Sequence, residues 1–416
     1  MKNIIFLSYL SIWSIDEGKG AQSFNKTINK YINDGWNVYL INPKEKNSDG
    51  KRIDNFKNIS FKPIFYKTTK IKKIGYFGKL LHSLQGSFHL YKECKKLLNK
   101  LNGQAIIYAY EVDSVRAAKR ISVEFRLPLV TRFQGTILTN RDNNIINRIR
   151  FHPHFHALQT KADITIMTDD GTKGNQVLMN VNNKSSIIKF WRNGVDIQKS
   201  YEIDEVEQKR KVKSLKEKYG ISNSDKVLVT ISRLASWKRV DRAISAFADA
   251  KKNIPSLKLI IVGDGEERES LKNIANKLNV EKDVIFVGAV AQKEIQLYLE
   301  IADVFLSLYD LSNVGNPLLE AMSCGKAIIT LNVGDTKSVI SNNYNGILIE
   351  PNDLKSIPDH IYKLIFDEKF SQFLSGNAAQ YAKENFWSWE DRMNAELEVI
   401  SNLLDYNSNP HNQFLL

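Results

Sequence analysis

The chain has 416 residues, of which 43% are hydrophobic and 25% charged, with 21 Gly and only 9 Pro. This usage is typical of folded globular proteins and excludes a collagenous, mucin-like or wholly disordered chain, and the length corresponds to about two or three domains, or two large α/β domains. The excess of 59 Lys and Arg over 46 Asp and Glu gives a net charge of +13, which favours a negatively charged partner: nucleic acid, an anionic membrane or a phosphorylated ligand.

The two cysteines and the amino terminus bear on the compartment. Cys94 and Cys324 are too few for a disulfide framework or a structural zinc site, so nothing indicates an oxidising compartment. Met1–Leu10 contains a short apolar run without a small-residue cleavage site after it, which favours a buried strand over a signal peptide. No segment reaches the roughly 18 apolar residues of a membrane span. We therefore expect a cytoplasmic protein, with peripheral attachment to the inner face of the membrane left open.

Short β-rich apolar runs alternate with helical stretches along the chain, a pattern typical of parallel sheets built from βαβ units. A helix over Gln22–Asp34 follows the first strand. The predicted strands of the first half are Ile4–Leu10, Asn37–Ile41, Ile106–Tyr110, Leu129–Thr131, Ile164–Thr168 and Ser186–Phe190, and those of the second half are Val227–Ile231, Leu257–Val262, Val284–Val287, Val304–Leu308, Ala327–Thr330 and Gly346–Ile349. The sequence therefore predicts an α/β fold with a doubly wound sheet in each half.

The joint between the halves is marked by a turn at Asn193–Asp196 and a charge-dense helical stretch, Tyr201–Lys218, that contains no strand. Near the end, Phe386–Trp389 precedes an amphipathic run, Glu390–Leu404, and a polar tail over Asp405–Leu416. We therefore expect one domain at 1–200, a second at 201–385, and a final helix with its tail at 386–416.

The segment Val304–Thr330 carries the most chemical information. A strand leads into a polar loop, Asp310–Asn316, and Pro317 and Gly325 stand where a helix would begin and end. Ligands of doubly wound sheets bind at the carboxyl ends of strands, and free N–H groups at a helix start favour a phosphate there. Glu320, expected in the first turn of that helix, either accepts hydrogen bonds from sugar or ribose hydroxyls or is an acid that suits the helix dipole.

Two cations follow the strand Val227–Ile231. Arg233 and Lys238 lie in a strand-to-helix loop at the same sheet edge, where they either hold a diphosphate or are solvated loop charges. A tight turn at Gly263–Gly265 follows the next strand, and Gly18–Ala21 precedes the first helix, where a backbone could approach a phosphate or a sugar.

Four motifs in this order carry a family resemblance: SRLxxxK with Arg233 and Lys238, VGDG at 262–265, NPLLEAMSCG at 316–325 and NGVD at 193–196. Together they resemble the family 4 retaining glycosyltransferases of the GT-B fold, over nearly the whole chain. The resemblance implies two Rossmann-like domains facing across a cleft. The acceptor side would be 1–200, the nucleotide-sugar side 201–385, and the final helix would cross back to the first domain.

The resemblance also implies roles for individual residues. Arg233 and Lys238 would stabilise the leaving diphosphate, and Glu320 would hold the ribose hydroxyls. The backbone at Gly315, Pro317 and Leu318 would approach the donor, and Gly20 would belong to a glycine loop of the first domain that faces it. Electrostatic stabilisation would suffice for the chemistry, so no metal and no cofactor besides the nucleotide diphosphate sugar substrate are expected.

Two positions depart from the family pattern. Counting back from Glu320, the first of the family's paired glutamates is replaced by Ser312; either Ser312 contacts the sugar differently or Asp310 takes the acidic role. Gln134 stands where many relatives have a His, and it can exchange hydrogen bonds with the sugar but cannot act as a base. The stretch Thr168–Thr172 is interpreted as a turn with a helix cap.

Two further patterns allow more than one interpretation. His152, His154 and His156 alternate as on a strand, but Pro153 and the helical sequence after it argue against a metal site. Lys62–Lys100 contains ten lysines and one acid among interleaved aromatic residues. It is either a solvated basic face or a surface for anionic lipid, and we favour the membrane. Nucleic acid is not expected, because no binding module accompanies the charge.

The function predicted from these features is retaining transfer of a sugar from a nucleotide diphosphate sugar to a glycan or lipid-linked acceptor, in surface polysaccharide or glycolipid synthesis. A sugar-nucleotide epimerase or hydrolase, and a catalytically weak glycosyltransferase-like partner subunit, are the alternatives.

Overall fold

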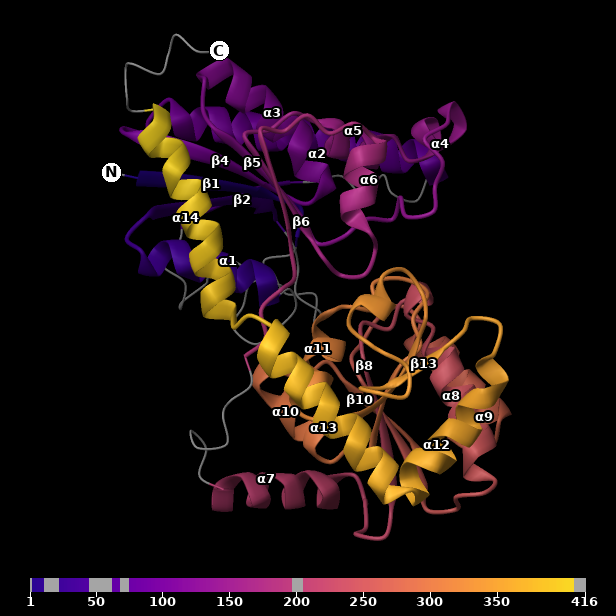
Figure 1. Cartoon of the computed structure of the whole chain (residues 1–416). Helices are drawn as coiled ribbons and strands as arrows, with labels where there is room; N and C mark the ends of the chain where they lie inside the picture. Colours follow the sequence, from indigo (N-terminus) through magenta and orange to yellow (C-terminus); the bar gives the residue numbers. More distant parts are fainter. Residues whose placement is uncertain (1, 11–21, 45–61, 68–74, 197–204, 408–416) are drawn as a thin grey trace. The chain divides into compact units, whose positions relative to one another are not determined.

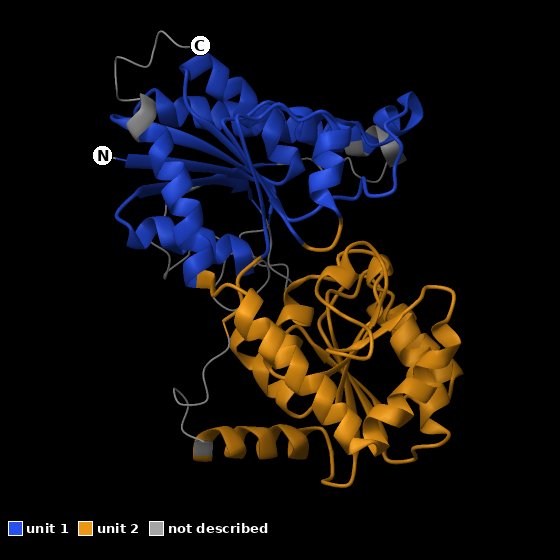
Figure 2. Ribbon diagram, in the orientation of Figure 1, with its two compact units in different colours: residues 1–169, 173–192, 390–416 blue, residues 170–172, 193–389 orange. Residues whose placement is uncertain are grey.

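The computed structural model describes residues 2–10, 22–44, 62–67, 75–196 and 205–407, and the chain forms two compact units (Figure 2). The first unit comprises residues 1–169, 173–192 and 390–416, and the second comprises residues 170–172 and 193–389. The main segment of the second unit runs from Asn193 to Trp389, where the sequence suggested 201 to 385.

A seven-stranded parallel sheet forms the centre of the first unit, in the order β3-β2-β1-β4-β5-β6-β7 (Figure 1). Its strands are β1 Lys2–Ser8, β2 Asn37–Pro43, β3 Lys62–Tyr66, β4 Gln104–Tyr110, β5 Leu129–Phe133, β6 Ile164–Thr168 and β7 Ile187–Trp191. Strand order reverses between β1 and β4, so the carboxyl ends of these two strands flank the position where doubly wound sheets bind ligands.

Helices cover both faces of this sheet. They are α1 Gln22–Asn33, α2 Gly75–Leu98, α3 Val112–Phe125, α4 Ile145–Arg150, α5 His152–Gln159, α6 Gly174–Asn180 and α14 Trp389–Asn407. Residues of α2, α3, α5 and α6 share one buried cluster, whereas Phe24 and Ile28 of α1 pack with Ile400 and Leu404 of α14 in the other. The last helix of the chain therefore completes the core of the first unit.

The second unit has a six-stranded parallel sheet in the order β10-β9-β8-β11-β12-β13. Its strands are β8 Lys226–Ile231, β9 Leu257–Val262, β10 Val284–Gly288, β11 Val304–Ser307, β12 Ala327–Leu331 and β13 Ile347–Ile349. The α-helices are α7 Glu205–Lys218, α8 Val240–Lys251, α9 Arg268–Lys277, α10 Ile295–Glu300, α11 Asn316–Ser323, α12 Ile357–Phe366 and α13 Glu368–Asn385. Here the strand order reverses between β8 and β11.

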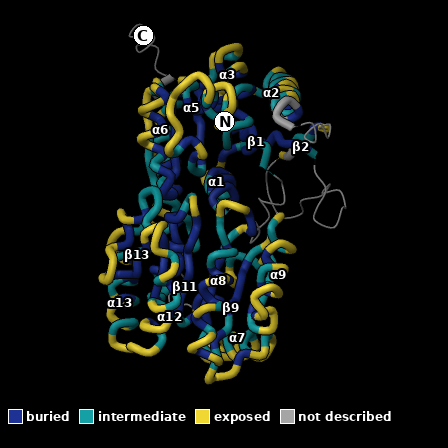
Figure 3. Tube along the Cα trace, turned by 90° about the vertical axis from the view of Figure 1, so that its right-hand side faces the viewer, coloured by how far each residue is buried: buried dark blue, intermediate teal, exposed yellow. Residues whose placement is uncertain are grey.

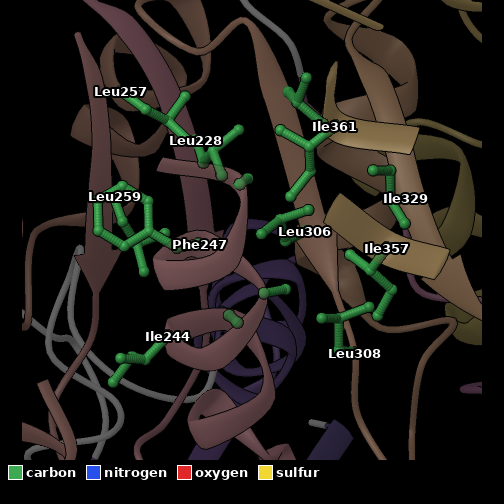
Figure 4. Packing of buried hydrophobic residues seen from close by; sticks show 14 of the residues in the cluster. Leu228, Ile244, Phe247, Leu257, Leu259, Leu306, Leu308, Ile329, Ile357 and Ile361 are labelled. Atoms are coloured by element: carbon green, nitrogen blue, oxygen red, sulfur yellow. The ribbon is translucent and has the colours of Figure 1, made fainter. Parts of the chain in front are cut away.

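Apolar packing on both faces explains why the strands of this sheet are continuous hydrophobic runs. Phe247 of α8 and Ile361 of α12 pack with Leu228 and Leu306 on one face (Figure 4). Figure 3 shows the central strands β9 and β11 mostly in dark blue, the colour of buried residues. A second cluster, which includes residues of α10, α11 and α13, covers the other face.

All twelve strands predicted from the sequence are present, with small shifts at their ends. The structure adds β3, which the sequence analysis had assigned to the basic stretch Lys62–Lys100. This strand pairs with β2 at the edge of the sheet, where Pro63 lies opposite Leu40. Proline has no N–H to donate and is tolerated at an edge. The basic stretch is therefore partly an edge strand and partly helix α2.

The helices bear on two local expectations, the alternating histidines and the polar tail. The alternating histidines do not lie on a strand, because His152–Gln159 forms helix α5 with Pro153 in its first turn. The described residues contain no group of three or more His, Cys, Asp or Glu that could hold a metal ion. Helix α14 extends to Asn407, into the predicted tail. None of the described helices is long and apolar enough to cross a membrane.

Candidate functional site

The candidate site lies where β8 and β11 end in the second unit. These strands are neighbours, with Val304 opposite Leu228 and Phe305 opposite Val229. The loops that follow them, residues 232–239 and 308–315, therefore leave the sheet side by side at its carboxyl edge. This is the position where the strand order reverses, and doubly wound sheets bind their ligands there.

Lys238 links the two loops. It ends a short 3-10 helix, Ser236–Lys238, and its ammonium donates a hydrogen bond of 3.2 Å to the Ser312 carbonyl. The same ammonium lies 4.3 Å from the centroid of the Tyr309 ring. Burial lowers the pKa of Lys238 to about 8, although the charge of Asp170 opposes this shift. A positive charge thus lies at the junction of the two loops, where it can attract an anion.

Asp170 is a site residue that the sequence analysis did not assign. It belongs to the second unit, and its carboxylate accepts a hydrogen bond of 2.5 Å from the Ser312 hydroxyl. Thr172 donates to the other carboxylate oxygen through its N–H and its hydroxyl. Burial raises the pKa of Asp170, against these hydrogen bonds. The acid therefore faces both Ser312 and the charge of Lys238.

The predicted turn at Thr168–Thr172 is present, but its role as a helix cap is wrong. Helix α6 begins at Gly174, and its N-cap, Lys173, makes no capping side-chain hydrogen bond. The side chain of Asp170 bonds within the turn and to Ser312 instead. The signal in the sequence was a pair of acids directly after a buried strand, at the edge where ligands bind.

Asp310 has a different environment from Ser312. Its carboxylate forms ion pairs with Arg239 at 3.3 Å and with Arg242 at 2.6 Å. Its N–H donates to the Trp237 carbonyl. Asp310 thus joins the start of the loop after β11 to the segment after β8, and its charge is compensated by two arginines.

Arg233 is exposed over 67% of its side chain and pairs with Glu266 at 3.1 Å. The loop that carries it is held by the turn at Gly263–Gly265. A Cβ atom at Gly263 would lie 1.8 Å from the Ser232 carbonyl oxygen, and one at Gly265 would lie 2.3 Å from that of Leu234. Glycine is therefore required at both positions, and the turn that the sequence predicted fixes the backbone beside Arg233.

Glu320 lies in α11, but not in its first turn as predicted. The helix begins at Asn316 after its N-cap, Gly315, so Glu320 is the fifth residue and the first turn contains no acid. The side chain is buried, and one carboxyl oxygen accepts a hydrogen bond of 2.6 Å from Gln292. Burial raises the pKa of Glu320 to about 8, and the charge of Asp196 adds to this shift. The raised pKa favours the protonated carboxyl at neutral pH, and in that form it both donates and accepts hydrogen bonds.

The backbone positions predicted at the start of α11 are found there. Pro317 is at the second helical position, as its missing N–H favours. Leu318 is buried, and its N–H donates to the Gly315 carbonyl at 3.0 Å. Gln292, which lies in the 3-10 helix Gln292–Glu294, had no signal in the sequence, because only the tertiary fold brings it to Glu320.

Gln134 belongs to the first unit, directly after β5. Its N–H donates a hydrogen bond of 2.8 Å to the carboxylate of Glu111, which follows β4. Glu111 has a positive φ of 69°, a strained conformation for a residue with a side chain, and such strain is concentrated at functional sites. Glu111 is thus a candidate functional residue of the first unit that the sequence analysis missed. Gly20 lies outside the described residues.

Comparisons with known proteins agree with this architecture. The family model described as glycosyl transferases group 1 matches residues 211–381, a span that contains Arg233, Lys238 and Glu320. The N-acetyl-alpha-D-glucosaminyl L-malate synthase of Bacillus anthracis is 31% identical over 279 residues, which are 66% of this chain and 68% of that protein. The alpha-monoglucosyldiacylglycerol synthase of Streptococcus pneumoniae is 32% identical over 155 residues, which are 37% of this chain and 35% of that protein.

A solved structure is similar over almost the whole chain. The crystal structure of Anabaena HepE in complex with UDP-glucose superposes with a TM-score of 0.72 at 19% identity, and the match covers 96% of this chain and 99% of that one. At this identity the similarity shows the fold. The two units, each with a parallel sheet between helices, have the GT-B architecture.

Proposed function

We propose, since this chain belongs to the glycosyl transferases of group 1, that it moves a sugar from a nucleotide diphosphate sugar to a glycan or lipid-linked acceptor, with retention at the anomeric carbon. The reaction would serve surface polysaccharide or glycolipid synthesis. In the transfer, the bond between the anomeric carbon and a phosphate oxygen breaks and a bond to the acceptor oxygen forms. The departing diphosphate then carries additional negative charge.

The ammonium of Lys238 is the observation that carries this proposal. It is a cation with a lowered pKa of about 8, held at the loop junction by a carbonyl and an aromatic ring. A group whose charged form is disfavoured by burial gains most from an anion placed beside it. Hydrogen-bond donors that are already oriented toward the developing charge lower the free energy of a transition state more than flexible donors do. We assign the diphosphate to this position.

Arg233 is the second cation of the proposed diphosphate site. Its only ion pair among the described residues is the exposed one with Glu266, and exposed pairs contribute little free energy. A phosphate could therefore replace Glu266 at small cost and gain two parallel hydrogen bonds from the guanidinium. The backbone at Gly315, Pro317 and Leu318, together with Ser312, would border the donor on the side of α11.

Glu320 would bind the ribose of the donor. Its buried carboxyl accepts a hydrogen bond from Gln292, its hydrogen-bond partner among the described residues, so oxygen lone pairs remain for the two ribose hydroxyls. Hydrogen bonds donated to a carboxylate favour its ionised form. The donor would therefore bind best when Glu320 releases its proton.

The acceptor class is inferred from the names of relatives. The names of two relatives contain an acceptor or a lipid: L-malate in one and diacylglycerol in the other. They share only part of their length with this chain, so the acceptor is proposed at the level of a glycan or a lipid-linked molecule. An epimerase or hydrolase acting on the same donor, and a catalytically weak partner subunit, are the competing functions.

A donor panel distinguishes these functions. The purified protein is incubated with UDP-, GDP- and ADP-sugars, with and without a membrane lipid extract, and nucleoside diphosphate release is measured. We expect release from one class of donor that increases with the extract and requires Lys238. Formation of an isomeric sugar nucleotide without release would instead identify an epimerase. Absence of both release and donor binding would refute the proposal.

A further inference from the structure

Helix α4 of the first unit exposes apolar side chains to solvent. In Ile145–Arg150 the three isoleucines, Ile145, Ile146 and Ile149, are 74%, 72% and 62% exposed, and none of its residues is buried. The helix lies at the periphery of the unit (Figure 1). Isolated exposed apolar residues are common, but three on six consecutive residues mark an interaction surface.

The helix is nevertheless held firmly in place. Its N-cap, Asn144, accepts a hydrogen bond of 2.9 Å from the N–H of Asn147, whose side chain donates to the Asp142 carbonyl. Arg148 donates to Gln159 of α5 at 3.0 Å. Because these contacts fix the backbone, the outward position of the isoleucines is a feature of the fold and not of a frayed end.

Three arginines lie in the same stretch of sequence as the isoleucines and next to aromatic rings. Arg141 and Arg150 lie 4.9 and 5.5 Å from the Phe151 ring, and Arg148 lies 5.9 Å from that of Phe155. The stretch 141–150 contains one acid, Asp142, against these three cations. The local charge is therefore positive, as is that of the whole chain.

One more apolar side chain lies near this helix. Asn143 donates a hydrogen bond of 2.8 Å to the carbonyl of Asn180, which ends helix α6, and the preceding residue, Met179, is 80% exposed. We call Ile145, Ile146, Ile149 and Met179, with the three arginines, the α4 patch.

We propose that the α4 patch is a contact surface for an anionic bilayer, in which the isoleucines enter the interface and Arg141, Arg148 and Arg150 bind lipid phosphates. In such a membrane, apolar side chains enter the acyl-chain region and the cations beside them contact the phosphates of the headgroups. The arginines favour a partner with negative charge, and the isoleucines favour a partner with an apolar interior. An anionic bilayer has both. The surface binds lipid independently of the transfer reaction, so its test needs no donor.

The α4 patch differs from the surface that the sequence favoured. In the described part of Lys62–Lys100, the ammonium of Lys62 lies over the Tyr39 ring, and Lys95 and Lys96 form ion pairs with Glu124 and Glu93. Exposed ion pairs contribute little free energy, so the variants below compare the two surfaces directly. Lys70, Lys72 and Lys73, which the sequence analysis had counted in this surface, lie outside the described residues.

Flotation with vesicles tests the proposal. Wild type is mixed with vesicles of phosphatidylcholine alone or with phosphatidylglycerol, at low and high salt. We expect binding to the anionic vesicles that weakens with salt. The variant Ile145→Ser/Ile146→Ser/Ile149→Ser should bind at least about tenfold more weakly, because the apolar area no longer gains from leaving water. The variant Arg141→Gln/Arg148→Gln/Arg150→Gln should lose the preference for anionic vesicles.

Two control variants make the result specific. Tyr362→Ser/Phe366→Ser removes two exposed aromatic residues from α12 of the second unit and should float like wild type. Lys92→Glu/Lys96→Glu/Lys100→Glu reverses charge on and after α2. Loss of flotation in this lysine variant, with retention in the isoleucine variant, would overturn the proposal in favour of the basic stretch.

Self-association is the other outcome that would refute it. If wild type binds neither kind of vesicle and elutes as a dimer that the isoleucine variant dissociates, the patch is an interface between copies of this chain. Thermal midpoints of all variants check folding, and exposed side chains should leave them unchanged. As a gain-of-signal measurement, Ile146→Trp should add fluorescence that brominated lipids quench; no added quenching would contradict insertion.

Discussion

The two units each contain a buried glutamate, and the two have opposite electrostatic environments. Glu396 of α14 is 1% exposed and Glu320 of α11 is 7% exposed. Burial would raise the pKa of Glu396, but the charges of Arg132 and Arg392 outweigh it and lower that pKa. Burial raises the pKa of Glu320 to about 8, and the hydrogen bond from the neutral amide of Gln292 opposes this shift without cancelling it. The charged or neutral partners of each glutamate, and not its depth of burial, decide the direction of its pKa shift.

This difference in partners indicates that Glu396 stabilises the fold, whereas Glu320 is available to a ligand. Glu396 accepts hydrogen bonds from Arg132 at 3.1 Å, Arg392 at 2.9 Å and the Tyr108 hydroxyl at 2.6 Å. Arg132 and Tyr108 come from β5 and β4, so the cluster ties α14 to the sheet of the first unit. No cation compensates Glu320 among its described partners. A ligand can therefore bind to Glu320 without breaking an ion pair.

The largest expected effect concerns the cluster of the first unit. Glu396→Gln leaves two buried guanidinium groups without a countercharge, and breaking a buried pair in this way costs about 3–5 kcal/mol. Urea unfolding followed by a probe in the first unit measures the loss. The control, Glu398→Gln, changes an exposed glutamate of the same helix and should be nearly neutral. Equal stabilities of the two variants would show that the cluster does not hold α14.

In the second unit, removal of a charge should impair catalysis and spare the fold. Lys238→Ala should lower kcat by about 10²-fold, the scale of losing one preorganised donor, with little change in the unfolding midpoint because no ion pair is broken. Lys252→Ala, an exposed lysine of this unit, is the control. Arg233→Ala should have a smaller effect, since its exposed charge is screened. Normal turnover of the Lys238 variant would remove that residue from the site.

Donor affinity should depend on pH with a maximum near pH 8. As pH rises toward that value, Glu320 ionises and accepts hydrogen bonds from the ribose; above it, Lys238 loses the charge that holds the diphosphate. Calorimetry with the donor between pH 6 and 9 measures both limbs. Glu320→Gln should bind the donor about tenfold more weakly at pH 8 and lose the rising limb. A monotonic profile in wild type would contradict these assignments.

The last prediction concerns stability without ligand. The pKa of Glu320 is higher in the folded chain than the ordinary value of 4.5, so the folded state binds more protons than the unfolded state between about pH 5 and 8. Its contribution to stability is therefore complete at low pH and is lost as pH rises through this range. Glu320→Gln does not titrate and should gain stability relative to wild type from pH 5 to pH 8. The thermal midpoints of wild type and Glu320→Gln are measured at pH 5 and pH 8. If the difference between the two proteins is the same at both pH values, the buried carboxyl of Glu320 is not protonated in the folded chain.

Much of the fold follows from local sequence. The runs that form β8 and β11 are apolar at nearly every position, because parallel strands between helices are buried on both faces. Pro317 and Gly325 bound α11 where their backbone preferences place them; Gly325 has a φ of +59°. Strand β3 escaped prediction because lysine and proline interrupt its short apolar run, and pairing with β2 compensates for them.

The sequence by itself determined the two parallel sheets, the loops that carry Lys238 and Ser312, and the family. Tertiary structure alone decided what each polar group meets: Asp170 bonds to Ser312, 142 residues away, Asp310 lies between two arginines, and Gln292 is the partner of Glu320. The isoleucines of α4 are exposed in the fold, and apolar character alone does not predict this. Backbone preferences and apolar periodicity act over a few residues and can be read locally. The charge state and accessibility of a side chain depend on neighbours that only the folded chain brings together.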